Sequence, residues 1–131
     1  MSAHRRPVTA LGAPGALGPY SHGIISGGLL YCSGQTPLDP ESGELVTGTI
    51  QDRTRRCLDN LGAVCAAAGA QLTDAVRLTV YVTDMSAFAQ VNEAYAEYFP
   101  VDPPARVTIG VAALPLGTDV EIDAVVALSA G

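Results

Sequence analysis

Within residues 75–83, AVRLTVYVT, apolar and polar side chains alternate from Val76 onward. The apolar side chains are Val76, Leu78, Val80 and Val82, and the polar ones are Arg77, Thr79, Tyr81 and Thr83. This period of two predicts a strand with one apolar and one polar face. Because helical patterns flank the strand on both sides, the chain must form a sheet whose apolar face is covered by helices.

Two segments with helical periodicity lie on either side of this strand. The first follows the capping signal Thr49-x-x-Asp52 and runs to about Ala68, before a glycine that suits a helix end. The second begins after Asp84 or Ser86 and stops at a proline, Pro100. The apolar stripes are Leu58, Leu61, Val64, Cys65 and Ala68 in the first helix, and Phe88, Val91, Tyr95 and Tyr98 in the second.

The remaining elements complete the order ββαβαββ. Residues 24–34 predict a hairpin around Gly27-Gly28, and two further strands are expected at about 106–112 and 119–128. Right-handed crossovers place both helices on the same face of a single mixed sheet, which defines an α+β fold. No segment is left to cover the second face, so oligomerisation is expected. Residues 1–17 predict a loose arm and residues 18–131 a single domain.

Charge and composition exclude several classes of function. The formal net charge of −6 argues against a nucleic-acid-binding protein. There is no lysine, so Schiff-base chemistry is impossible, and the two histidines, His4 and His22, predict no metal site. No cofactor-binding motif and no membrane-spanning stretch are present. The three cysteines, in a chain without an export signal, predict reduced thiols and a cytoplasmic protein.

Arg106 lies at the start of a predicted strand, in the segment PPARVTIG at 103–110. Alternation puts Arg106 and Thr108 on the same side of that strand, and Glu121 and Asp123 on the polar side of the next. If the two strands form a hairpin, their polar faces coincide, and Arg106 and Glu121 share a face. From spacing alone, a surface salt bridge is the commoner arrangement, and a carboxylate-binding site is the alternative.

Five groups of residues, in a fixed order and spacing, extend from about Gly18 to Leu128. They are GPYS at 18–21, YCSGQTPLDPESGEL at 31–45, LDNLGAVCAAAGA at 58–70 with VYVTDMSAFAQVNEAYAEYF at 80–99, PPARVTIGVAALP at 103–115, and VEIDAVVAL at 120–128. With them the chain resembles the RidA/YjgF/UK114 family of small enamine/imine deaminases, also called the endoribonuclease L-PSP family. The resemblance implies a chorismate-mutase-like fold and a homotrimer with a binding cleft at each subunit interface.

The resemblance also implies site residues. Arg106 would bind a substrate carboxylate, and Glu121 would act on the attacking water. The other substrate-binding residues would be Tyr20, Ser33, Gly34 and Asn92, which match positions of the family, and Thr108, which lies two residues after Arg106. Each of the first four has a structural alternative. Tyr20 and Asn92 could be turn or helix-surface residues, Ser33 could be a strand residue with a satisfied hydroxyl, and Gly34 could meet a requirement of the backbone.

The chain departs from the family pattern at three places. Many members carry cysteine where this chain has Thr108, which excludes a thiol nucleophile at that position. Many carry glutamine where this chain has His22, for which a core or surface role is favoured over tuning of pH dependence. The loop PVDPP is shorter than in many members, which would reshape the mouth of the cleft.

The resemblance implies a 2-iminobutanoate/2-iminopropanoate deaminase, a hydrolase that converts reactive imino acids to 2-keto acids and ammonia in metabolite damage control. Its ligand would be a small 2-imino or 2-keto acid, with no nucleic acid, membrane, cofactor or metal involved. The alternatives are a trimeric module that binds a small carboxylate without turnover, a deaminase dedicated to one pathway, and an RNA-cleaving protein. The acidic composition and the lack of a histidine pair disfavour the last.

Overall fold

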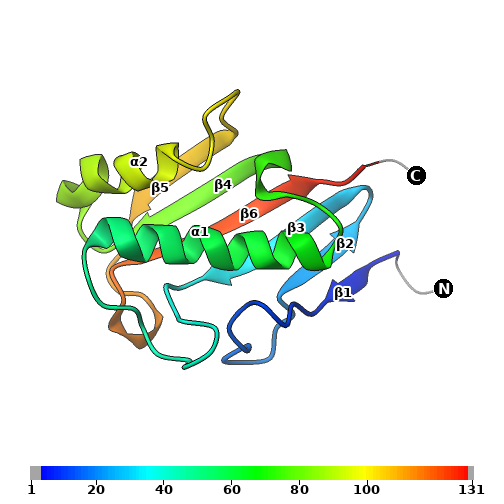
Figure 1. Cartoon of the computed structure of the whole chain (residues 1–131), viewed down its shortest axis with the longest axis horizontal. Helices are drawn as coiled ribbons and strands as arrows, with labels where there is room; N and C mark the ends of the chain where they lie inside the picture. Colours follow the sequence, from blue (N-terminus) through cyan, green and yellow to red (C-terminus); the bar gives the residue numbers. More distant parts are fainter. Residues whose placement is uncertain (1–3, 130–131) are drawn as a thin grey trace.

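The computed structural model describes residues 4–129, which form one six-stranded sheet with two α-helices packed on one face (Figure 1). The strands are β1 Arg6–Val8, β2 Gly23–Ser26, β3 Leu29–Gln35, β4 Ala75–Val82, β5 Ala105–Gly110 and β6 Val120–Ala127, and the helices are α1 Ile50–Ala67 and α2 Phe88–Ala96. The strand order is β1-β2-β3-β6-β4-β5. Only the β4–β5 pair is parallel among these strands, so the predicted α+β class with a mixed sheet is confirmed.

The β2–β3 hairpin forms where the sequence predicts it. Ser26 pairs with Leu29, and the two residues between them, Gly27 and Gly28, have φ angles of 60° and 78°. Positive φ at both central positions is the conformation of a type I′ turn, whose twist matches that of the flanking strands. Glycine adopts this conformation without steric cost, which explains the Gly-Gly pair.

Helix α1 begins and ends as predicted. Thr49 accepts a hydrogen bond from the Asp52 N–H, and the Asp52 carboxylate accepts one from the Thr49 N–H, which completes the capping box. Gly69, with a φ of 77°, follows the end of the helix. The apolar stripe of α1 packs against the sheet, with Leu58, Leu61 and Val64 fully buried.

All three cysteines, Cys32, Cys57 and Cys65, are buried and free.

The N-terminal segment is part of the domain, which corrects the expectation of a loose arm over residues 1–17 as far as the described residues are concerned. Strand β1 pairs with β2, and Ala10 and Ala13 are buried in the core. His22 fixes the turn between them, because its Nδ1 accepts from the Ala10 N–H at 2.9 Å and its Nε2–H donates to the Pro14 carbonyl at 2.8 Å. His22 is therefore a core residue with a structural role.

The predicted β5–β6 hairpin is wrong. Strand β4 lies between β5 and β6, pairing in parallel with β5 and antiparallel with β6. Strand β5 therefore forms one edge of the sheet, next to α2 (Figure 1). Strand β4 alternates as predicted except at its start, where a register shift between Ala75 and Arg77 leaves Val76 exposed.

Neither helix covers the second face of the sheet (Figure 1), which we call the open face. Tyr31, Val107 and Ile109 are exposed large side chains, and strand alternation and register place all three on this face. Within residues 4–129, no helix combines the length and apolar character needed to cross a bilayer.

Candidate functional site

Arg106 is held by helix α2 at the exposed edge of the sheet. Its Nη1 donates to the Asn92 side-chain oxygen at 2.8 Å. The guanidinium carbon lies 4.7 Å from the centre of the Tyr95 ring and 5.5 Å from that of Phe88, distances typical of cation–π contacts. We call Arg106, Asn92 and Tyr95 the arginine cluster. Because the rings and the amide fix the guanidinium, it offers its remaining N–H donors in a set orientation.

A cavity of about 340 Å³ adjoins the arginine cluster. Its lining residues are Asn92, Tyr95, Ala96, Phe99, Pro103, Pro104 and Arg106. In the described chain no salt bridge to Arg106 is found, so its charge is available to an anion. The predicted alternative, a surface salt bridge between Arg106 and Glu121, is therefore excluded within one chain.

Glu121 belongs to a second group of predicted residues. A cavity of about 260 Å³ is lined by Leu17, Tyr20, Ser33, Gly34, Thr36, Pro115 and Glu121. We call Tyr20, Ser33, Gly34 and Glu121 the glutamate cluster. The Ser33 hydroxyl donates to the Ser21 carbonyl at 2.6 Å, and the Tyr20 hydroxyl accepts from the Leu17 N–H at 3.1 Å.

Gly34 allows the Glu121 carboxylate to lie against strand β3. The register between β3 and β6 shifts between Cys32 and Gln35, so Ser33 and Gly34 lie in a bulge opposite β6. A Cβ added at position 34 would overlap the Glu121 Oε2 and lie 3.0 Å from its Cδ. The φ of Gly34 is not among the positive ones, so the backbone itself does not need glycine here. Glycine is needed only to keep the Glu121 carboxylate in this position.

The environment of Glu121 suits a general base. Burial raises the pKa of its carboxyl above the usual range, and the nearby Asp123 carboxylate raises this pKa further. Within residues 4–129 no side chain or backbone group donates a hydrogen bond to it at hydrogen-bond distance. A carboxylate with a raised pKa and free lone pairs is better able to accept a proton near neutral pH.

The two clusters lie on opposite faces of the sheet. Arg106 pairs with Leu78 on β4, and Leu78 points toward the helices. Glu121 pairs with Tyr81, three residues further along β4 and therefore on the open face. The expectation that Arg106 and Glu121 share a face is wrong, because it depended on the β5–β6 hairpin. A single chain holds the two clusters apart.

The structure also separates Thr108 from both cavities. Its hydroxyl oxygen is buried and has no hydrogen-bond partner among the described residues, and Thr108 does not line the cavity of either cluster. Helical spacing places Phe88 and Tyr95 in an apolar stripe, but both rings also contact the Arg106 guanidinium. The signal was present in their spacing, because Phe88, Asn92 and Tyr95 are at positions i, i+4 and i+7 of one helix face.

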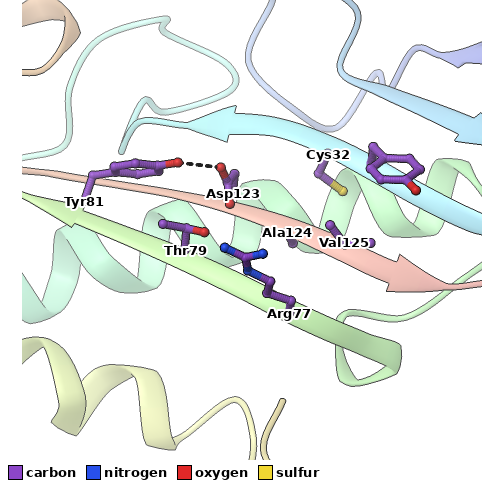
Figure 2. A pocket seen from close by; sticks show the side chains of 8 residues that line it. Cys32, Arg77, Thr79, Tyr81, Asp123, Ala124 and Val125 are labelled. Atoms are coloured by element: carbon purple, nitrogen blue, oxygen red, sulfur yellow. Dashed lines mark hydrogen bonds between the residues drawn. The ribbon is translucent and has the colours of Figure 1, made fainter. Parts of the chain in front are cut away.

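The open face carries a third hollow, of about 310 Å³, that contains none of the predicted site residues (Figure 2). Its polar residues include Arg77, Thr79, Tyr81 and Asp123, and the Tyr81 hydroxyl donates to the Asp123 carboxylate at 2.8 Å. Burial raises the pKa of the Tyr81 hydroxyl, and this hydrogen bond to Asp123 raises it further. Residues 4–129 contain no group of three or more His, Cys, Asp or Glu side chains arranged to hold a metal ion.

Replacing Gly34 by alanine should displace the Glu121 carboxylate and leave the fold intact. The added methyl would occupy the position of Oε2, and the flexible glutamate side chain can rotate away at little cost to the backbone. We expect any activity that depends on the position of the Glu121 carboxylate to fall by at least about tenfold, while the thermal midpoint changes little. Ser26→Ala, in the same hairpin and outside both clusters, is the control. Unchanged activity in Gly34→Ala would contradict this role of the close contact.

The comparisons with known proteins identify the family. The family model described as endoribonuclease L-PSP matches residues 10–128, and the chain belongs to this family, which confirms the expected RidA/YjgF/UK114 resemblance. The human protein named 2-iminobutanoate/2-iminopropanoate deaminase is 43% identical over 121 residues, covering 92% of this chain and 88% of that protein.

Solved structures share the whole fold. A putative endoribonuclease from Thermotoga maritima has a TM-score of 0.91 at 45% identity, covering 95% of this chain and 98% of that chain. Escherichia coli TdcF with bound serine has a TM-score of 0.88 at 35% identity, covering 95% and 99% respectively.

Proposed function

We propose that this chain hydrolyses 2-imino acids to 2-keto acids and ammonia, at a site formed between two copies of the chain. The observation that carries the proposal is the separation of a fixed, unpaired arginine and a carboxylate of raised pKa onto opposite faces of one sheet. A cyclic homotrimer would bring the arginine cluster of one copy to the glutamate cluster of the next. The exposed apolar side chains of the open face support such an assembly.

Arg106 would position the substrate. The planar guanidinium can donate two parallel N–H bonds to a carboxylate, which fixes the position and orientation of the group together. The Asn92 hydrogen bond and the two aromatic rings hold the guanidinium before the substrate arrives. The ordering of this side chain therefore costs little on binding.

Glu121 would act on the water. As the water oxygen attacks the imine carbon, C2, the C=N π electrons move to nitrogen, and Glu121 accepts a proton from the water. The proton that Glu121 accepts passes to the nitrogen, which gives a neutral tetrahedral carbinolamine and regenerates the carboxylate. The hydroxyl proton of the carbinolamine then passes to the nitrogen by way of Glu121, the C–N bond breaks, and the oxygen forms the C2=O bond of the 2-keto acid. One water is consumed and one ammonia is released. An enamine would react after it tautomerises to the imine.

The comparisons support this chemistry for the chain. A human relative carries the name of a deaminase of 2-iminobutanoate and 2-iminopropanoate, and a solved relative holds serine, a small molecule with a carboxylate. The buried free cysteines favour a reducing compartment, so we place the reaction in the cytoplasm. A module that binds a small carboxylate without turnover would also use Arg106. That function would not explain why the Glu121 carboxylate, with its raised pKa, lines a cavity.

The proposed function is tested by generating 2-iminopropanoate and 2-iminobutanoate in solution with an amino-acid oxidase. Semicarbazide traps the remaining imine, and we expect the protein to lower the trapped amount and to raise the rate of 2-keto acid formation. Heat-denatured protein is the control. Equal imine lifetimes with native and denatured protein would overturn the assignment.

Replacing Arg106 by lysine should lower kcat/KM although the charge is kept. Lysine cannot supply two coplanar donors, and the loss of a charge-assisted hydrogen bond corresponds to about 1.5–3 kcal/mol, or about ten- to a hundredfold. The control is Arg55→Lys, which changes a half-buried arginine that is paired with Asp52 and Glu97 and lies outside both clusters, so it should leave kcat/KM unchanged. Wild-type kcat/KM in Arg106→Lys would reduce Arg106 to a surface charge.

A further inference from the structure

We propose that the cavity beside Arg106 receives the side chain of the substrate, and that it selects 2-imino acids with uncharged apolar side chains larger than a methyl group. This inference rests on the proposed function, because it assumes that Arg106 binds the substrate carboxylate. The proposal gives a role in specificity to Ala96, Phe99, Pro103 and Pro104. None of these residues takes part in binding the substrate carboxylate or in activating the water.

The position of the cavity ties it to the substrate. Arg106 and Asn92 line it together with the apolar residues, so a ligand whose carboxylate binds Arg106 begins at its edge. The Tyr95 ring lies against the guanidinium and also lines the cavity, which leaves the plane of the guanidinium as the direction of approach. The group attached to C3 of the substrate can then extend between α2 and the loop before β5.

The lining determines the class of side chain. Phe99 and Tyr95 are almost fully buried and pack against each other with ring centres 4.9 Å apart, so they form a fixed apolar wall. Among the residues of one copy that line the cavity, Arg106 is the only charged one, and the substrate carboxylate already occupies it. A second charge, on the substrate side chain, would therefore lose hydration in this cavity without gaining a counter-ion from its lining.

The volume determines the size of the side chain. The cavity has about 340 Å³ and opens to solvent on one side, so it has room for a side chain much larger than a methyl group. A methyl group would leave most of the lining in contact with water, whereas an isobutyl or benzyl group would displace far more of that water. Each buried CH₂ then favours the larger substrate by about fourfold.

The loop that closes the cavity is short and stiff. Residues 97–104 connect α2 to β5, and the last two are Pro103 and Pro104, whose φ angles are fixed by their rings. Asp102 adopts a φ of 46°, a left-handed conformation that further restricts the backbone. A wall that is already ordered does not have to be ordered by the ligand, so the cavity is available in the free protein.

The first experiment compares imines generated in solution from alanine and from leucine. We expect kcat/KM for the leucine-derived imine to exceed that for the alanine-derived imine by at least about tenfold. Calorimetric binding of the products provides a readout that does not need turnover, and 4-methyl-2-oxopentanoate should bind at least about tenfold tighter than pyruvate. The glutamate-derived imine should be the poorest of the three.

A matched pair of variants places the preference in the cavity. Ala96 is an exposed residue at the end of α2 that lines the cavity, and Ala89 is an exposed residue of the same helix that does not. Ala96→Phe should fill the cavity and reduce the leucine-to-alanine ratio to about one, whereas Ala89→Phe should preserve the ratio. Thermal midpoints of both variants test the fold, and Ala96→Leu replaces Ala96→Phe if the latter does not fold.

The outcomes distinguish this inference from the proposed function. Equal kcat/KM and equal binding for the two side chains in the wild type, or an unchanged ratio in the Ala96 variants, would overturn the cavity's role while imine hydrolysis stands. If neither imine is hydrolysed, the proposed function fails, and the binding of the two 2-keto acids still decides whether the cavity prefers the larger side chain.

Discussion

Replacing Glu121 by glutamine is expected to lower kcat for imine hydrolysis by about 10²–10⁴-fold, the usual contribution of a positioned general base. Glutamine has nearly the same shape and can still contact a water molecule, but it cannot accept a proton from it. Binding of 2-keto acids at Arg106 should be unchanged, because the arginine cluster contains no atom of Glu121. Product binding by calorimetry and turnover on the same preparation separate the two effects.

The pH dependence gives this prediction a second readout. Since the pKa of the Glu121 carboxyl is raised, the wild-type kcat/KM should fall on acidification at a pH above that expected for an ordinary glutamate. Asp123 contributes to the shift, so Asp123→Asn should move this acid limb to lower pH. Glu121→Gln should lose the limb altogether. An identical limb in all three proteins would assign it to another group.

Stability should change in the opposite direction from turnover. A carboxyl group whose pKa is raised by folding favours the folded state below its unfolded pKa, and this contribution is lost as the pH rises through its folded pKa. At pH 7 the ionised Glu121 therefore opposes folding. Glutamine removes that charge, so the thermal midpoint of Glu121→Gln at pH 7 should equal or exceed that of the wild type. A large decrease would make Glu121 a structural residue.

Local sequence patterns predicted the elements that local interactions determine. The Gly27-Gly28 turn, the Thr49–Asp52 capping box and both helices depend on residues within one or two turns of each other, and all were predicted. The β5–β6 pairing failed because the true neighbour of both strands, β4, lies earlier in the chain. Strand β1 was missed because what orders it is distant in sequence, namely its pairing with β2 and the hydrogen bonds of His22.

Sequence motifs predicted the individual residues of the site but not their arrangement in space. Sequence motifs predict Arg106 and Glu121 individually, and the structure shows a guanidinium fixed by α2 and a carboxyl group of raised pKa. Their relative position depends on strand order, which periodicity within a strand does not contain. The same limit applies to Gly34, whose requirement comes from the Glu121 side chain of another strand and not from its own backbone conformation.

Mixing two inactive variants should restore activity, because the proposed site takes Arg106 from one copy and Glu121 from the next. In the proposed homotrimer, Arg106→Ala alone or Glu121→Gln alone damages every site. When the two are unfolded and refolded together in equal amounts, a site is intact only where the copy supplying Arg106 is the glutamine variant and its neighbour supplying Glu121 is the alanine variant. Random cyclic assembly makes roughly one site in four intact, so about a quarter of wild-type activity is expected.

The size of this recovery distinguishes the proposal from its alternatives. If one copy supplied both residues, no mixture would contain an intact site, and the activity would stay at the mean of the two variants. A mixture of Arg106→Ala with the Arg106→Ala/Glu121→Gln double variant is the control, since no copy in it retains Arg106. Mass photometry of the mixture must show trimers, because monomers that nevertheless regain activity would contradict a shared site. The register of β4 with its two neighbours, which puts Arg106 on the helix-covered face and Glu121 on the open face, is the reason to expect recovery.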